Sequence, residues 1–167
     1  AVTVVGHDRP GIVADVTGAL AEHGGNIEDS SMTLLRGHFA WTLVVAVDSD
    51  VATLEASLDA LQNDELKIAV VQLPAEVTAS HAPTHWLSVH GSDRPGIVSA
   101  VTGEVAAVGG NITDLTTRLA GNLYVVLADV FLPPGSDVEG LALRLASVGS
   151  ELGVDVTLRV ADTDDVL

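Results

Sequence analysis

The sequence predicts an α+β protein made of two tandem βαββαβ units, each with a four-stranded antiparallel sheet and both helices on one face. Three observations carry this prediction. Residues 6–29 return as residues 91–114, an offset of 85 positions, with 16 of 24 identical. Each copy shows the same order of strand and helix patterns. Segment 74–84 contains two prolines and no period, which predicts a linker between domains 1–73 and 85–167.

Each unit is expected to open with a short apolar strand, a sharp turn and a helix. The strands are expected at 2–5 and 86–89. Gly24-Gly25 and Gly109-Gly110 are expected to end the helices, because glycine tolerates a left-handed cap. Apolar residues between turn and glycines have helical spacing. The residues expected on the buried helix face are Ile12, Val13, Val16 and Leu20, then Ile97, Val98, Val101, Val105 and Val108.

A hairpin follows each helix, with turns expected at 36–37 and 121–122. From the opening asparagine to the turn glycine lie ten residues in the first copy and nine in the second. The second hairpin is therefore expected to be shorter or shifted in register, with Asp129 on the face of Val45. Strict alternation predicts a buried face in the first copy. Its residues are Phe39, Trp41, Leu43, Val45 and Val47.

A second helix and a last strand complete each unit. Ser136 and Glu139 have the spacing of a capping box, and Ser49 is the expected cap in the first copy. The last strands are expected at 66–73 and 154–160. This order is that of the split βαβ, ferredoxin-like plan.

Charge and composition exclude several function classes. The chain carries 7 Lys and Arg against 23 Asp and Glu, a formal net charge of -16, which disfavours direct contact with nucleic acid or anionic membrane. It has no cysteine and no secretory h-region, and its apolar runs are too short to span a bilayer, so we expect a cytoplasmic protein. Catalytic and phosphate-binding motifs are absent, and His81, His85 and His90 form no metal set. We therefore expect no enzyme activity, no cofactor and no metal.

The Asp-Arg-Pro-Gly turns at 8–11 and 93–96 are the strongest functional signal. Each lies between a strand and a helix N-terminus, where free N–H groups can bind a carboxylate. The glycine would let a ligand approach the backbone. The alternative is that Asp8 and Asp93 only cap their helices. Arg9 and Arg94 either clamp an anion or are solvated surface residues.

Asn26 and Asn111 open the second strand of each unit, and we expect them beside the same turn. A side-chain amide both donates to a carboxylate and accepts from an ammonium, which suits a free amino acid. The alternative is an asparagine that bonds its own turn. Trp41 and Trp86 are interpreted as core residues rather than ligand stackers.

These residues give a resemblance that covers both units. Asp-Arg-Pro-Gly-Ile-Val after the first strand and Gly-Gly-Asn-Ile before the second resemble the ACT domain, a regulatory amino-acid-binding module. The tandem pair is similar to the glycine cleavage system transcriptional repressor family, and deformylases of formyltetrahydrofolate share a similar stretch. The resemblance implies a ligand site where the turn meets a neighbouring ACT unit. The matching residues are Asp8, Pro10, Gly11, Ile12, Asn26 and Ile27, then Asp93, Pro95, Gly96, Ile97, Asn111 and Ile112.

The resemblance also implies a function. We expect a regulatory protein that binds an amino acid and acts through a DNA-binding regulator protein, with a second copy of the chain as a further partner. Serine-sensing ACT domains often carry a histidine two residues before the polar residue of the turn. Gly6 and Gly91 stand there, so serine is not the implied ligand. The alternative is a structural oligomerisation module with vestigial ligand sites.

Overall fold

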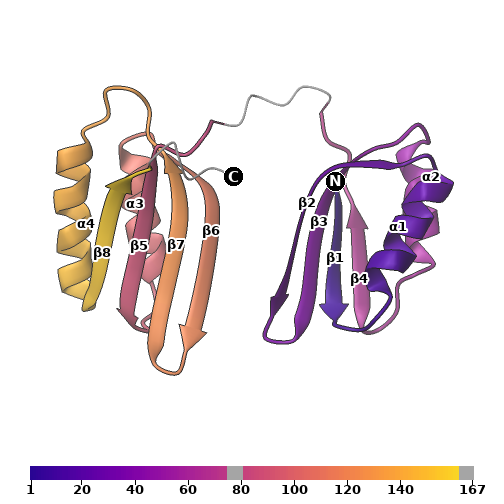
Figure 1. Ribbon diagram of the computed structural model, residues 1–167, viewed down its shortest axis with the longest axis horizontal. Coiled ribbons are helices and arrows are strands. Elements are labelled where there is room, and N and C mark those ends of the chain that lie inside the picture. Colours follow the sequence, from indigo (N-terminus) through magenta and orange to yellow (C-terminus); the bar gives the residue numbers. More distant parts are fainter. Residues whose placement is uncertain (75–80, 162–167) are drawn as a thin grey trace. The chain divides into compact units, whose positions relative to one another are not determined.

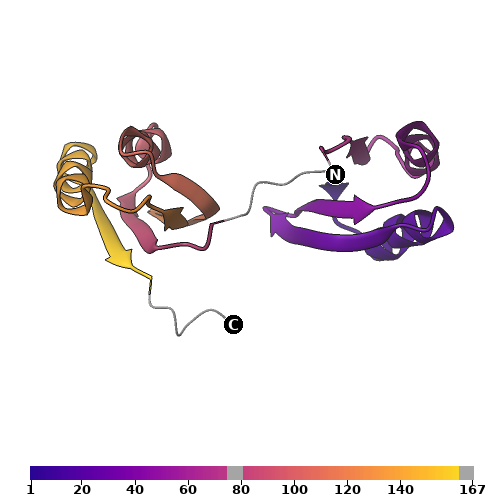
Figure 2. The same ribbon diagram turned by 90° about the horizontal axis from the view of Figure 1, so that it is seen from above.

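A computed structural model describes residues 1–74 and 81–161, in two compact units that the segment 75–80 connects (Figure 1). The end of the predicted second domain, 162–167, also lies outside the described residues. In each unit both helices cover the same face of a four-stranded antiparallel sheet (Figures 1 and 2), which confirms the predicted fold. Among the helices within residues 1–74 and 81–161, none combines the length and the apolar composition that a membrane span requires.

In unit 1 the sheet order is β2-β3-β1-β4. Strand β1 runs to His7, beyond the predicted end at 5, whereas β4 ends at Val70, three residues short of the prediction, because its ladder with β1 stops at the Val2–Val70 pair. The elements are β1 Val2–His7, α1 Ile12–Glu22, β2 Asn26–Leu35, β3 His38–Ala46, α2 Val51–Asp59 and β4 Leu66–Val70.

Unit 2 repeats this topology with the sheet order β6-β7-β5-β8. Its first residues reach into the predicted linker. Thr84 N–H donates to the Val130 carbonyl over 2.9 Å, and the His81 ring stacks on Phe131 with centroids 4.2 Å apart. The elements are β5 His85–Ser92, α3 Ile97–Ala107, β6 Asn111–Ala120, β7 Leu123–Phe131, α4 Val138–Leu152 and β8 Val154–Val160.

The two hairpins have the same length and register, so the expected shortening is wrong. Strands β2 and β6 both span ten residues, with an irregularity at the same place. Both turns have two residues, but Gly37 is second in its turn and Gly121 is first, with φ of 84° and 62°. The two copies therefore differ in which turn position the glycine occupies, and not in the length or register of their strands. Asp129 consequently matches Val44 rather than Val45, on the sheet face away from the helices.

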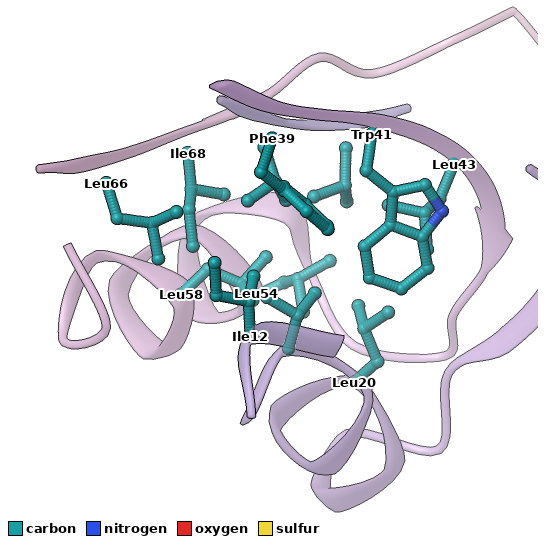
Figure 3. Close-up of a cluster of buried hydrophobic side chains, with 12 residues drawn as sticks. Ile12, Leu20, Phe39, Trp41, Leu43, Leu54, Leu58, Leu66 and Ile68 are labelled. Atoms are coloured by element: carbon teal, nitrogen blue, oxygen red, sulfur yellow. The ribbon is translucent and has the colours of Figure 1, made fainter. Parts of the chain in front are cut away.

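The core of unit 1 lies between β3, β1 and the two helices, as Figure 3 shows. Phe39, Trp41 and Leu43 are buried, as the alternation predicts, and Val45 and Val47 are partly buried against them. The aromatic rings of Phe39 and Trp41 meet edge to face, with centroids 6.2 Å apart.

Three residues on α1 face this core, and three residues on α3 face the separate core of unit 2. They are Ile12, Val16 and Leu20, and Ile97, Val101 and Val105. Val98 and Val108 pack at the margin of the second core. Val13 is 43% exposed, so its predicted burial is wrong. A helical residue next in sequence to a core residue is turned about 100° from it, which leaves Val13 beside the core stripe.

The second helix of each unit is capped by an aspartate, one residue after the predicted serine. Asp50 accepts from the backbone N–H of Thr53 at 2.9 Å and from its hydroxyl at 2.7 Å. The Thr53 hydroxyl and then its N–H hold the pKa of Asp50 below the ordinary 3.8. In unit 2 Asp137 accepts from Gly140 N–H at 2.9 Å. The serine predictions are wrong because Ser136 donates backward to the Pro133 carbonyl and the Ser49 hydroxyl is buried without a partner.

Candidate functional site

A hollow of about 470 Å³ lies at the N-terminus of α1 in unit 1. The β1–α1 turn and the first turn of α1 form one wall. The helix-side face of β2 and β3 forms the other. Its lining residues are Asp8, Arg9, Gly11, Ile12, Val13, Ala14, Met32, Leu34 and Phe39.

Glycine is required where α1 begins. Gly11 is the N-cap residue with φ 94° and ψ -12°, and Gly96 has φ 92° and ψ -5° at the start of α3. A residue with a Cβ is strained in this left-handed region. No side chain caps either helix, so the interpretation of Asp8 and Asp93 as caps is wrong. The reason is positional, because the helix starts four residues after each aspartate and not one.

The uncapped first turn leaves backbone donors for a ligand. Asp15 N–H and Ala100 N–H bond to the carbonyls of Gly11 and Gly96, which are the first helical bonds. The N–H groups before them have no partner within an α-helix, and the helix dipole adds positive potential there. A carboxylate suits such a position. Asp8 lines the same hollow and can receive an ammonium.

The two arginines of the motif behave differently. Arg9 pairs with Asp15 across 3.0 Å and also donates to the Pro10 carbonyl at 3.2 Å, so it stays over the start of α1. Unit 2 has Ala100 in place of Asp15. There the Arg94 guanidinium lies by the C-terminus of α4, where a Cβ placed on Gly153 would be 3.6 Å from its Nη2. Arg9 therefore belongs to its hollow, whereas Arg94 is directed to the end of α4.

An exposed apolar wall is the part of the site that sequence reasoning missed. Val13, Met32 and Leu34 are 43%, 51% and 50% exposed. Met32 and Leu34 are two positions apart on β2, on the helix side of the sheet. The sequence signal that could have revealed this wall is the alternation of apolar Met32 and Leu34 with polar residues along β2. At the matching positions unit 2 carries Thr117 and Leu119, a more polar pair.

The asparagines lie far from the turns. Asn26 pairs with Ala46, whereas the end of β1 at His7 pairs with His38. Eight residues along β3 separate these positions, which is about 26 Å at the usual strand rise. Asn111 holds the same position in unit 2, where it pairs with Phe131. The expectation that Asn26 and Asn111 lie beside the turns is therefore wrong within a single unit.

The remaining predicted residues divide between core and surface. Ile12 and Ile97 are each 1% exposed, so their side chains belong to the core even though Ile12 also lines the hollow. Ile27 is exposed beside Asn26, whereas Ile112 packs against the second core. Pro10 and Pro95 each precede the left-handed glycine of their turn, next to Gly11 and Gly96.

The glycines before the turns have a steric cause. A Cβ on Gly6 would collide with the Glu65 carbonyl oxygen, and a Cβ on Gly91 would come within 2.7 Å of the Val154 side chain. Backbone of the neighbouring edge strand approaches too closely for any side chain. The histidine expected of a serine-sensing relative has no room here.

Comparison with known proteins identifies the family to which the two units belong. The family model of the ACT domain matches residues 1–71 and again 86–159. The chain belongs to the ACT domain family. Each match covers nearly one whole unit, so this chain contains two ACT domains in tandem.

Two curated relatives and one solved structure extend the comparison. The glycine cleavage system transcriptional repressor of Escherichia coli is 26% identical, over 96% of this chain and 89% of its own length. A UPF0237 protein of Methanopyrus kandleri is 44% identical over 80 residues, 48% of this chain and 83% of its own. The crystal structure of an unknown protein from Galdieria sulphuraria is 31% identical with a TM-score of 0.76, covering 96% of both chains.

Proposed function

We propose that this tandem ACT protein is a regulator that binds a free amino acid at the hollow of unit 1. One observation carries the proposal: an uncapped helix N-terminus faces a hollow that also contains Asp8 and an exposed apolar wall. The backbone donors of α1 would hold the carboxylate and Asp8 the ammonium. Val13, Met32 and Leu34 would contact the side chain, which favours small or apolar amino acids over charged ones.

The distance between the asparagines and the turns limits how both could contact one ligand. A ligand that contacts Asp8 and also an asparagine of this motif requires two ACT units, because about 26 Å separates the two positions within one unit. Asn26 and Asn111 remain proposed ligand residues on this condition. Asp93, Pro95 and Gly96 are the corresponding proposed residues of unit 2.

A direct binding test uses the full chain. We expect one or more of the twenty amino acids to raise the melting temperature and to give a saturable heat in calorimetry. Asp8→Asn should weaken this binding by about tenfold, since a charged hydrogen bond is lost. Glu55→Gln is the control, because it removes the same charge from the exposed face of α2, which does not line the hollow. Binding by none of the twenty, or equal weakening by both variants, would reject the site.

The regulatory output is proposed to pass through a DNA-binding protein. One relative that spans both units is named a transcriptional repressor, yet this chain carries a net charge of -16. An amino acid would act by preferring one state of the ACT pair and so changing its affinity for the partner.

A structural role is the second candidate, supported by the edge strand of unit 1. Met32, Leu34 and Leu35 on β2 are each about half exposed, which is unusual for an unprotected sheet edge. A module that only joins copies of the chain would self-associate without any amino acid. Sedimentation with and without the ligand found by calorimetry separates the two candidates, because a purely structural module associates to the same extent in both samples, whereas a regulator that acts through its own association changes it when the amino acid binds.

A further inference from the structure

A second hollow, of about 450 Å³, lies on the sheet of unit 2. The core residues of β5 and β7 point to the helices, so Trp86, Leu127 and Asp129 lie on the opposite face. Trp86 is 36% exposed and Leu127 is 54% exposed, so the interpretation of Trp86 as a core residue is wrong. Ser88 and Arg159 complete the polar lining.

One row across the sheet places opposite charges on either side of the indole. Asp129 and Arg159 are both register partners of Trp86, one on β7 and the other on β8. Two strand spacings, about 10 Å, separate their backbones. Among the ion pairs of the described residues none joins Asp129 to Arg159. The two charges therefore face one hollow without neutralising each other.

A second carboxylate strengthens the acidic end of this row. Asp114 on β6 is the direct register partner of Asp129. Like charges that face each other across a strand pair destabilise a sheet unless a cation lies between them. The end of the hollow at Asp129 is consequently a place for a cationic group.

These residues are not part of the repeated ligand motif. At the matching positions unit 1 has Val44 in place of Asp129 and Ala1 in place of Trp86. Val71, whose N–H donates to the Ala1 carbonyl, stands where unit 2 has Arg159, the register partner of Trp86. The charged row belongs to unit 2 alone, on the sheet face that the helices leave uncovered.

We propose that this row is a second ligand site, for a zwitterion with an apolar side chain. The ammonium binds Asp129, the carboxylate binds Arg159 and the side chain lies on Trp86 and Leu127. An α-amino acid with its two charged hydrogen bonds spans about 9 Å, and the long, flexible side chain of Arg159 can adjust its distance from the Asp129 carboxylate on the same sheet face to this span. The arginine fork is suited to a carboxylate, and an apolar group gains from contact with exposed indole. This site is independent of the hollow at α1.

NMR titration of the full ¹⁵N-labelled chain with L-leucine tests the proposal. Saturable shifts are expected at the amides of Ser88 and Leu127 and at the indole N–H of Trp86. L-leucinamide lacks the carboxylate and 4-methylpentanoate lacks the ammonium, so each should bind at least tenfold more weakly. These analogues need no variant and keep the test valid if a substitution disturbs the fold. Equal binding of all three probes, or no shift at these residues up to millimolar leucine, would overturn the proposal.

Substitutions of the two charged residues test whether they hold the ligand. Asp129→Asn and Arg159→Gln should each weaken leucine binding about tenfold or more. The controls Asp155→Asn and Arg118→Gln make the same charge changes on the same sheet, in other rows. Equal loss in controls and row variants would overturn the proposal. Shifts confined to residues 8–14 would also overturn it while supporting the hollow at α1, so the two sites can fail separately.

Discussion

At the scale of single residues, Gly11 is the position on which the candidate site depends. Its φ of 94° costs an alanine about 1–2 kcal/mol, so Gly11→Ala should destabilise unit 1 by that amount. Gly18→Ala is the matched control in the same helix. Nothing lies within 4 Å of a Cβ at Gly18, so this change should stabilise the helix by about 0.5–1 kcal/mol.

Urea unfolding followed by the fluorescence of Trp41 measures both variants. A Trp86→Phe background leaves Trp41, which is in the core of unit 1, as the single reporter. If Gly11→Ala proved as stable as the parent, the left-handed start of α1 would be disproved.

His85 predicts a pH dependence of unit 2. Burial lowers its pKa from the ordinary 6.5, and its Nδ1 lies 2.8 Å from the Thr84 hydroxyl. Below pH 6.5 the unfolded chain binds the proton more readily than the folded chain does, so the free energy of unfolding should fall as pH falls through this window. Above pH 6.5 the contribution is fully present.

The comparison of His85→Asn with the parent tests this linkage. Urea midpoints at pH 7.5 and at pH 5.5 should differ less for His85→Asn than for the parent. His90→Asn is the control, because His90 is on the same strand with an exposed side chain. Identical pH dependence in all three proteins would contradict the assignment.

At the scale of elements, the sequence predicted which helices and strands form, but not where helices begin. Periodicity located α1 and α3 because their core stripes are strictly spaced. Ser136 and Asp137 are both good N-cap residues and adjacent, so composition alone could not choose between them. The tight turn before α4 explains why Asp137 is the cap. In this turn the Ser136 hydroxyl donates to the Pro133 carbonyl and does not accept from the helix.

The cap assignment gives a prediction for α4. Asp137→Ala should cost about 1 kcal/mol, because Gly140 N–H loses its acceptor, and Ser136→Ala should cost less. Hydrogen exchange of the α4 amides measures both changes in one experiment. If the α4 amides lost more protection in Ser136→Ala than in Asp137→Ala, Ser136 and not Asp137 would be the N-cap residue.

The candidate site was predicted only in part, for a topological reason. The turn residues were recognisable because they repeat, and Gly11 and Gly96 adopt the conformation that glycine permits. Asn26 and Asn111 were misplaced because α1 and α3 carry the chain back along the sheet before the second strand starts. Eleven helical residues cover about 16 Å, so the strand must begin at the other end of its sheet.

At the scale of the whole molecule, the negative net charge disfavours direct binding of this protein to DNA, although it is proposed to take part in transcriptional regulation through a partner. The net charge is -16, and Lys67 is the single lysine of the sequence. Two of the six arginines, Arg9 and Arg144, are held in ion pairs with Asp15 and Glu104. Nonspecific DNA affinity comes mainly from the release of counterions by several cationic contacts, and seven Lys and Arg side chains among 23 carboxylates disfavour such a set of contacts.

The purified chain is therefore expected not to shift duplex DNA in a gel, even at micromolar protein and low salt, with or without an amino acid. The amino acid that binds best in calorimetry should be present in one series, since a change of state could expose the remaining arginines. Addition of a basic DNA-binding regulator should produce a ligand-sensitive shift if the partner mechanism holds. Retardation by the chain alone would show that its few cations form one continuous surface, and the regulation would then require no partner.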